Sequence, residues 1–271
     1  VPTATWLNHF ILAEKANTLG YRSLFTGLGG DELNAGEYDY FFYFFADLKH
    51  QKKDALLRKE IEAWIRNHNH PIFQKSEHLA MSQISKLTSQ SAIGNCNPDI
   101  ELLYKYQQIL HPNLTDLADV IPTYYATSNS YLLTHSRNEL LKNTMPCCLR
   151  ASNLNSSAMG ISDFHPFLDY RLFELMDRVP SEQKIQNGIT KAFARRAYKG
   201  LLPEATRTRI TKKGWNAPAH QWFANQGQTK LLDLISSRQF IERGIYNQKE
   251  LQKVVNEHFE IIESGKNIEN H

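Results

Sequence analysis

Residues 21–38 read YRSLFTGLGGDELNAGEY, and they decide the fold class that we expect for this chain. The apolar run at 21–25 predicts a strand, and three glycines within residues 27–30 predict a tight loop directly after it. A glycine-rich loop after a strand commonly seats a phosphate group, usually with positive charge nearby. This loop continues instead into Asp31 and Glu32. Its ligand must accept carboxylates beside it, unless the loop is an ordinary turn whose acids cap the next helix.

Standard phosphate-loop patterns do not fit these residues. No Gly-Lys-Ser/Thr follows the loop, and Glu32 stands where a dinucleotide-binding fingerprint needs its third glycine. Magnesium would resolve the charge conflict, because Mg²⁺ takes one or two carboxylates together with phosphate oxygens. We therefore expect the backbone at Gly27, Gly29 and Gly30 to approach phosphate or ribose oxygens, and Asp31 to hold the metal.

The positive charge that a phosphate chain needs lies much later in the sequence. Residues 189–197, ITKAFARRA, place Lys191 and Arg195 one helical turn apart, so both side chains can face one ligand. Residues 207–215, RTRITKKGW, add a basic loop with Lys212 that could neutralise a departing pyrophosphate. Taken alone, such a basic run is more often a solvated surface than a binding site.

Composition and charge narrow the classes of function. The 271 residues carry a net charge of +3, too small for a large nucleic-acid or membrane surface. The most apolar window, 38–48, is about half the length that a membrane helix needs, so we expect a buried helix there. Cys147 and Cys148 are adjacent, and no zinc-ligand spacing accompanies the three cysteines. We expect plain, partly buried thiols in a cytoplasmic protein.

Hydrophobic periodicity predicts a mostly helical chain with one strand. A first helix should end at Gly20, and the others are expected at 54–67, 76–86, 99–110, 123–142, 168–179, 191–199, 228–237 and 248–264. Because one strand cannot form a sheet, its partners are either hidden in the chain or belong to sequence outside it. Residues 49–122 read as a helical elaboration, and 226–271 as C-terminal helices. We expect His165, which precedes a proline, to be structural.

Four motifs in this order resemble the synthetase domain of glutamine-dependent asparagine synthetases. The loop at 26–38 is similar to the family pattern SGxGGDExFGGY. Residues 156–172, SSAMGISDFHPFLDYRL, resemble RxxMAxGIExRxPFLD, and residues 188–203, GITKAFARRAYKGLLP, resemble GxxKxxLRxAxxxxLP. Residues 209–222, RITKKGWNAPAHQW, resemble RxKxGFxxPxxxW. Four ordered motifs, spread over about residues 1–225, are far more specific than any one of them.

The resemblance implies a fold, a reaction and site residues. The fold would be α/β, the mostly helical C-terminal part of a parallel-sheet synthetase domain of the adenine-nucleotide-hydrolase-like (HUP) type. The reaction would adenylate a small-molecule carboxylate with ATP and Mg²⁺. Ammonia, released from glutamine by an N-terminal glutaminase domain, would then displace AMP. Thr26 and Gly27 would contact the nucleotide, and Asp31 would take Mg²⁺. Lys191 and Lys212 would bind the pyrophosphate and the transition state of acyl transfer. A homodimer is compatible with this interpretation, and no nucleic-acid or membrane partner is expected.

Three departures from the family pattern leave the substrate open. The pyrophosphate loop SGGxDS is missing, so we expect the chain to be the C-terminal part of a longer polypeptide. Leu28 stands where asparagine synthetases have a glutamate and their β-lactam-forming relatives a tyrosine. Ser162 and Phe164 replace the Glu and Arg of GIExR. The activated carboxylate could therefore belong to aspartate, or to a sugar acid, a peptide or a β-amino acid. A non-catalytic relative is a third option, whereas a nucleic-acid binder that uses the 207–213 basic run is disfavoured.

Overall fold

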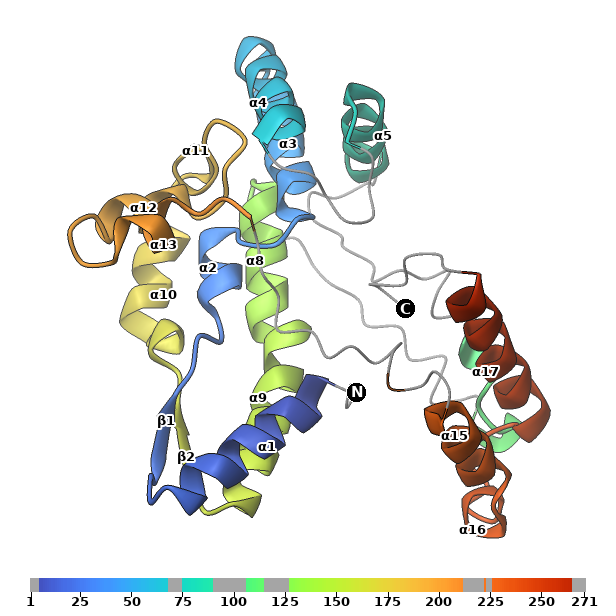
Figure 1. The fold of residues 1–271 in the computed structure, drawn as a ribbon. Helices are drawn as coiled ribbons and strands as arrows, with labels where there is room; N and C mark the ends of the chain where they lie inside the picture. Colours follow the sequence, from blue (N-terminus) through green and yellow to red (C-terminus); the bar gives the residue numbers. More distant parts are fainter. Residues whose placement is uncertain are drawn as a thin grey trace. The chain divides into compact units, whose positions relative to one another are not determined.

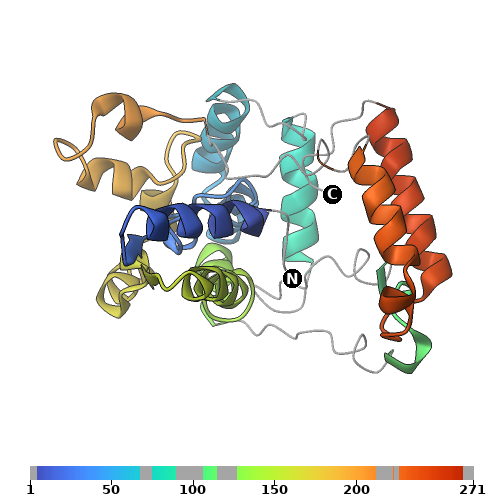
Figure 2. The same ribbon diagram turned by 60° about the horizontal axis from the view of Figure 1, so that its bottom comes forward.

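The fold is described from a computed structural model, which covers residues 5–67, 75–89, 106–114, 127–211, 222 and 226–264. The chain forms two compact units, and each is described by itself (Figures 1 and 2). The first comprises Val1–Asn95 and Tyr124–Trp215, and the second comprises Cys96–Thr123 and Asn216–His271. All of the predicted site residues that the structure describes belong to the first unit.

The first unit contains the predicted strand and a partner for it. β1, Ser23–Phe25, pairs in parallel with β2, Ser162–Phe164, so that the first residues of the two strands are paired and the last residues likewise. With three residues, β2 is too short to show an alternating pattern, and this partner was hidden in the sequence. α1, Thr5–Thr18, and α9, Thr144–Ala158, lie side by side next to the strands (Figure 1). Between them lies a small apolar cluster that comprises Ala13, Ala16, Leu24, Met159 and Ile161.

The largest apolar core surrounds α3, Tyr40–His50, whose first six residues are all aromatic. A helix that is apolar on every side must be buried, and three long helices pack against this one. They are α4, Asp54–Asn67, α5, Glu77–Thr88, and α8, Tyr131–Leu141. The large buried side chains of this core include Tyr40, Phe41, Phe44, Phe45, Leu48, Trp64, Leu132 and Ile185. The buried helix expected at 38–48 is therefore confirmed.

Asp47 is a polar anchor inside that core. Its carboxylate accepts hydrogen bonds from the hydroxyls of Ser130 (2.6 Å) and Ser181 (2.7 Å), and from the amide of Tyr131 (2.5 Å). Burial raises the pKa of Asp47, although these bonds favour its ionised form. The side chain thus ties α3 to the start of α8 and to the short helix α11, Ser181–Lys184.

A second apolar cluster lies around the end of β1 and β2. It joins α2, Gly30–Asn34, the 3₁₀ turn η2, Pro166–Leu168, and α10, Tyr170–Asp177. Its side chains include Leu28, Leu33, Leu140, Met145, Phe167, Leu168, Phe173 and Met176. Two further short helices, α12, Ala192–Ala197, and α13, Glu204–Thr208, follow in the chain. Phe167 and Leu168 of this cluster pack against Gly29 and Gly30 of the glycine-rich loop.

The second unit is helical where it is described. Its elements are η1, Pro112–Leu114, α15, Gln226–Ser236, α16, Arg238–Ile241, and α17, Gln248–Glu263. Leu110 and Tyr246 form an antiparallel bridge, and the ring of Phe240 stacks on Tyr246 with centroids 5.2 Å apart. In the parts of the chain that are described, no helix combines the length and the apolar content needed to cross a membrane.

Most predicted helices are confirmed, and the exceptions have local causes. α4 has the predicted bounds, while α1, α5, α10, α12, α15 and α17 differ from their predicted ranges only at the ends. α8 begins late, because Ser130 caps it by accepting a hydrogen bond from the amide of Leu133 (3.1 Å). α9 was missed because TMPCCLRASNLNSSA is rich in Ser and Asn and has a proline in its first turn. The helix expected at 99–110 lies largely outside the described residues.

Candidate active site

The glycine loop, residues 26–30, turns the chain from β1 into α2. Gly29 has φ 86°, in the left-handed region that glycine adopts without strain. A Cβ atom there would also lie 2.3 Å from Cδ2 of Leu168, so a larger residue would force the Leu168 side chain to move. Next to it, the ring of Phe167 would lie 3.5 Å from a Cβ atom on Gly30. The contact at Gly30 is an ordinary one, so Gly29 is the residue whose missing side chain lets the loop lie directly on η2.

Thr26 fixes the start of this loop to the end of β2. Its amide donates to the carbonyl of Phe164 (2.9 Å), and its hydroxyl hydrogen-bonds Nδ1 of His165 (2.6 Å). His165 thus contacts the start of the loop, and its expected structural role stays a prediction. Two motifs that lie far apart in the sequence are therefore in direct contact here.

Asp31 and Lys191 form an ion pair at the first turn of α2. Both were predicted as site residues, one for metal and one for phosphate, and the structure brings them together. The Lys191 backbone is in the left-handed region, with φ 58°, and its amide donates to the carbonyl of Asn34 (3.2 Å). The side chains are 29% exposed for Asp31 and 38% exposed for Lys191, so a ligand from solvent can reach both.

The ion pair lies over Gly36, which belongs to the motif at 26–38 but was not predicted as a site residue. A Cβ atom on Gly36 would be 2.0 Å from Oδ1 of Asp31 and 2.5 Å from Cε of Lys191. The glycine after α2 therefore leaves room for the two charged side chains to meet. Gly36 carries no side chain, and the contacts of its neighbours show what the glycine of the motif makes room for.

Further acids lie close to the pair. Burial is the main cause that raises the pKa of Glu32, and the carboxylates of Asp31, Glu37 and Glu139 raise it further. Burial raises the pKa of Tyr40 well above its usual range, and nearby carboxylates, of which Glu32 has the largest effect, raise it further. This excess of negative charge favours a cation beside α2, and Lys191 is the cation that the structure places there.

The donor set suits magnesium bound together with phosphate. Among the described residues, no group of three or more His, Cys, Asp or Glu side chains could hold a metal ion by itself. A partly exposed carboxylate such as Asp31 matches the way Mg²⁺ usually binds, with one or two protein carboxylates and its other ligands from water and phosphates. The residues present therefore fit a metal that arrives with a nucleotide, and they do not form a closed protein site.

The side chain of Arg195 binds backbone carbonyl groups at this site. Its guanidinium donates to the carbonyls of Thr190 (2.9 Å) and Arg207 (2.6 Å), and Arg207 donates back to the carbonyl of Arg195 (3.1 Å). Burial lowers the pKa of Arg195, and the charges of Arg209 and Arg207 lower it further. The bonds join α12 to α13, where Arg207 also forms an ion pair with Glu204.

The remaining predicted positions fall in different places. Lys212 lies outside the described residues, and its role stays a prediction. Leu28 is half-buried in the apolar cluster under the loop. Ser162 and Phe164 point to the exposed face of β2, where the ring of Phe164 stacks on that of Phe25 with centroids 5.4 Å apart.

Asp163 lies between those two exposed positions and is half-buried, and the sequence patterns did not identify it. Its two oxygens accept hydrogen bonds from the hydroxyls of Ser152 (2.5 Å) and Ser156 (2.7 Å) on α9. The two serines are one turn apart, so they present one polar face to β2. That spacing in the sequence was the signal that could have revealed the contact.

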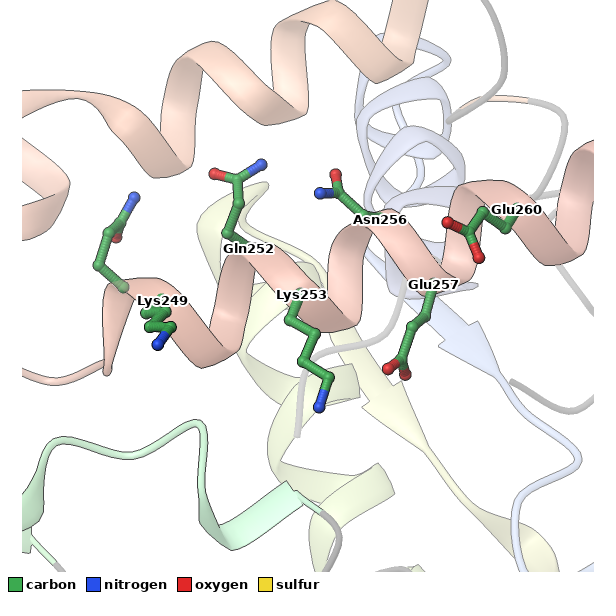
Figure 3. Close-up of a pocket in the computed structure, with 7 residues that line it drawn as sticks. Lys249, Gln252, Lys253, Asn256, Glu257 and Glu260 are labelled. Atoms are coloured by element: carbon green, nitrogen blue, oxygen red, sulfur yellow. The ribbon is translucent and has the colours of Figure 1, made fainter.

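A polar hollow lies along α17 in the second unit (Figure 3). Its lining side chains all come from that helix and include Lys249, Gln252, Lys253, Asn256, Glu257 and Glu260. Two lysines and two glutamates balance one another, and one helix cannot enclose a ligand. We therefore assign no function to it.

Comparison with known proteins supplies a family. The profile of the family described as "Asparagine synthase" matches residues 3–270. A curated relative, "Asparagine synthetase [glutamine-hydrolyzing] 1" of Bacillus subtilis (strain 168), is 30% identical over 159 residues. That alignment covers 54% of this chain and 23% of the relative, so the chain spans about a quarter of the protein it matches. No solved structure matches the chain.

Proposed function

The chain belongs to the asparagine synthase family, and from that membership we propose that it is part of an ATP-dependent amide ligase. In the proposed reaction, a substrate carboxylate attacks the α-phosphorus of ATP, which forms an acyl-adenylate and releases pyrophosphate. Ammonia then attacks the acyl carbon and releases AMP. The family match and the ion pair between Asp31 and Lys191 support this proposal.

That ion pair is the single observation that carries the proposal. A carboxylate and an ammonium group meet beside a glycine loop at the end of a strand, where α/β folds commonly bind ligands. Asp31 would hold Mg²⁺, which would neutralise phosphate charge when it is bound. Lys191 would then turn from Asp31 toward the phosphates and stabilise the charge that develops on the leaving pyrophosphate.

The other predicted residues complete this site in the proposal. The backbone of Thr26, Gly27, Gly29 and Gly30 would contact the nucleotide. Arg195 would supply positive potential, since its donors are engaged with carbonyls. Lys212 would act on the transition state of acyl transfer. Ammonia would come from glutamine through a glutaminase domain, and the enzyme would work in the cytoplasm, with a homodimer allowed.

The side chains around the loop favour a carboxylate other than aspartate as the second candidate. Leu28 belongs to an apolar cluster, so it offers no charge to an α-amino group. The neighbouring strand ends present the stacked rings of Phe25 and Phe164. Apolar groups at these positions would suit the carbon skeleton of a larger acid or a peptide.

Isotope exchange of pyrophosphate into ATP tests the proposal directly. The complete natural polypeptide should catalyse exchange with at least one acid from a panel of aspartate, β-amino acids, sugar acids and short acidic peptides. Asp31→Asn should abolish the Mg²⁺-dependent exchange, whereas Glu174→Gln, on the exposed face of α10, should leave it unchanged. No exchange with any acid, or full exchange by Asp31→Asn, would overturn the proposal. Exchange with aspartate alone would remove the second candidate.

A further inference from the structure

The turn that precedes Lys191 is held in an unusual backbone conformation. Gln186 and Ile189 form an antiparallel bridge, with two N–H···O bonds of 3.0 Å. Between them, Asn187 and Gly188 both have positive φ, at 52° and 67°. Two consecutive residues of this kind make the tightest hairpin turn, for which Asn-Gly is the preferred pair. Lys191 follows the turn almost immediately.

A buried carboxylate on α4 holds this turn. Glu60 is 4% exposed, and its two oxygens accept from the amides of Asn187 (2.9 Å) and Gly188 (2.8 Å). Hydrogen bonds to an ionised acceptor are roughly twice as strong as neutral ones. A side chain on Gly188 would collide with the backbone of Ala63, 2.4 Å from its Cβ atom, so the turn lies directly on α4. Asn67, at the end of α4, also donates to the carbonyl of Asn187.

The chain between this turn and the ion pair has little freedom. Beyond the turn, the carbonyl of Thr190 accepts from the Arg195 guanidinium, and the amide of Lys191 donates to Asn34. Lys191 is therefore fixed from α2 on one side and through the turn from α4 on the other. A change in the turn would move the Lys191 backbone relative to Asp31.

We propose that Glu60 is a positioning residue that holds Lys191 opposite Asp31 through the turn at 186–189. α4 lies in the segment that the sequence patterns predict to be a helical elaboration. In this proposal it is the support of a site lysine. The effect on turnover rests on the function proposed above, whereas the effect on the turn does not.

Three variants of the complete polypeptide test the idea. Glu60→Gln keeps the size of the side chain and one acceptor oxygen, and Glu60→Ala removes both acceptors. The control is Glu62→Gln, which removes a carboxylate from the exposed face of the same helix. Two experiments are made. The first is amide hydrogen exchange of peptides that cover 185–191, and the second is pyrophosphate exchange, which gives kcat and KM.

The rate of amide hydrogen exchange in residues 185–191 should rise by about 10-fold or more in Glu60→Gln, because a charge-assisted hydrogen bond is lost. In peptides from α3, the rate of amide hydrogen exchange should equal that of the unmodified protein. If the proposed function holds, kcat should fall by about 100-fold, the cost of a misplacement of about 1 Å. KM for the carboxylate should stay within twofold, and Glu62→Gln should match the unmodified protein in both readouts.

Unchanged hydrogen exchange at 185–191 in Glu60→Gln would refute the positioning role, whatever the activity. Faster exchange in the turn with unchanged kcat would refute its importance for the reaction. If the unmodified protein activates no acid, the proposed function fails. Hydrogen exchange alone then tests whether Glu60 holds the turn at 186–189. If Glu60→Ala does not fold, the hydrogen exchange of Glu60→Gln still tests the positioning role.

Discussion

Gly36→Ala tests the placement of the Asp31 and Lys191 side chains separately from the stability of the fold. The new methyl group would occupy the position 2.0 Å from Oδ1 of Asp31 and 2.5 Å from Cε of Lys191. Contacts this short are not tolerated, so at least one of the two side chains must turn away. No other atom lies closer than these two side chains, and the substitution is therefore aimed at the ion pair.

The cost to folding should be small. Gly36 is not among the glycines with positive φ, so alanine can adopt its backbone conformation. Such a replacement commonly adds about 0.4–1 kcal/mol of stability through the unfolded state. A partly exposed ion pair contributes about 0.2–1 kcal/mol, which would be lost. The two effects oppose each other, and the net change should stay within about 1 kcal/mol, a shift in Tm of about 2–4 °C or less.

The cost to catalysis should be large, because a displacement of about 1 Å in a site can reduce the rate about 100-fold. Pyrophosphate exchange by the complete polypeptide and thermal melting measure the two effects. Gly20→Ala is the opposite control, since Gly20 has φ 85° and open space around it. It should lower Tm and leave turnover unchanged. Full turnover in Gly36→Ala, or a loss of more than about 3 kcal/mol of stability, would refute this reasoning.

Three further substitutions probe the scaffold. Gly29→Ala should lower the free energy of unfolding by about 2–4 kcal/mol in urea titration, from positive φ and the collision with Leu168; a neutral effect would contradict the loop geometry. Asp47→Ala should cost about 3–5 kcal/mol, because it leaves buried donors without an acceptor, and Asn in its place should cost less. Burial lowers the pKa of Lys184 from 10.5 to about 8. As the pH rises, the folded state therefore loses this proton before the unfolded chain does. The free energy of unfolding consequently rises between pH 8 and 10.5. Lys184→Met should be roughly 3 kcal/mol more stable than the unmodified protein at pH 7 and lose that advantage above pH 10. A difference in stability that does not change with pH would contradict this reasoning.

The local elements of the site follow from the amino-acid sequence alone. An apolar run, closely spaced glycines and an Asp-Glu pair specify strand, loop and helix start, because each depends on residues within a few positions. The same holds for α4 and α17, whose apolar spacing is regular. Asp31 and Lys191 could be selected as candidates, since their charges match a phosphate chain and its metal.

Which of these residues meet became visible only in the folded chain. The fold pairs Asp31 with Lys191, places Leu28 among apolar side chains, and connects Glu60 to the turn before the lysine. It also supplies β2, whose three residues form a strand only beside β1. The physical reason is range. Propensity and periodicity act over one or two turns of chain, whereas these contacts depend on how distant segments pack.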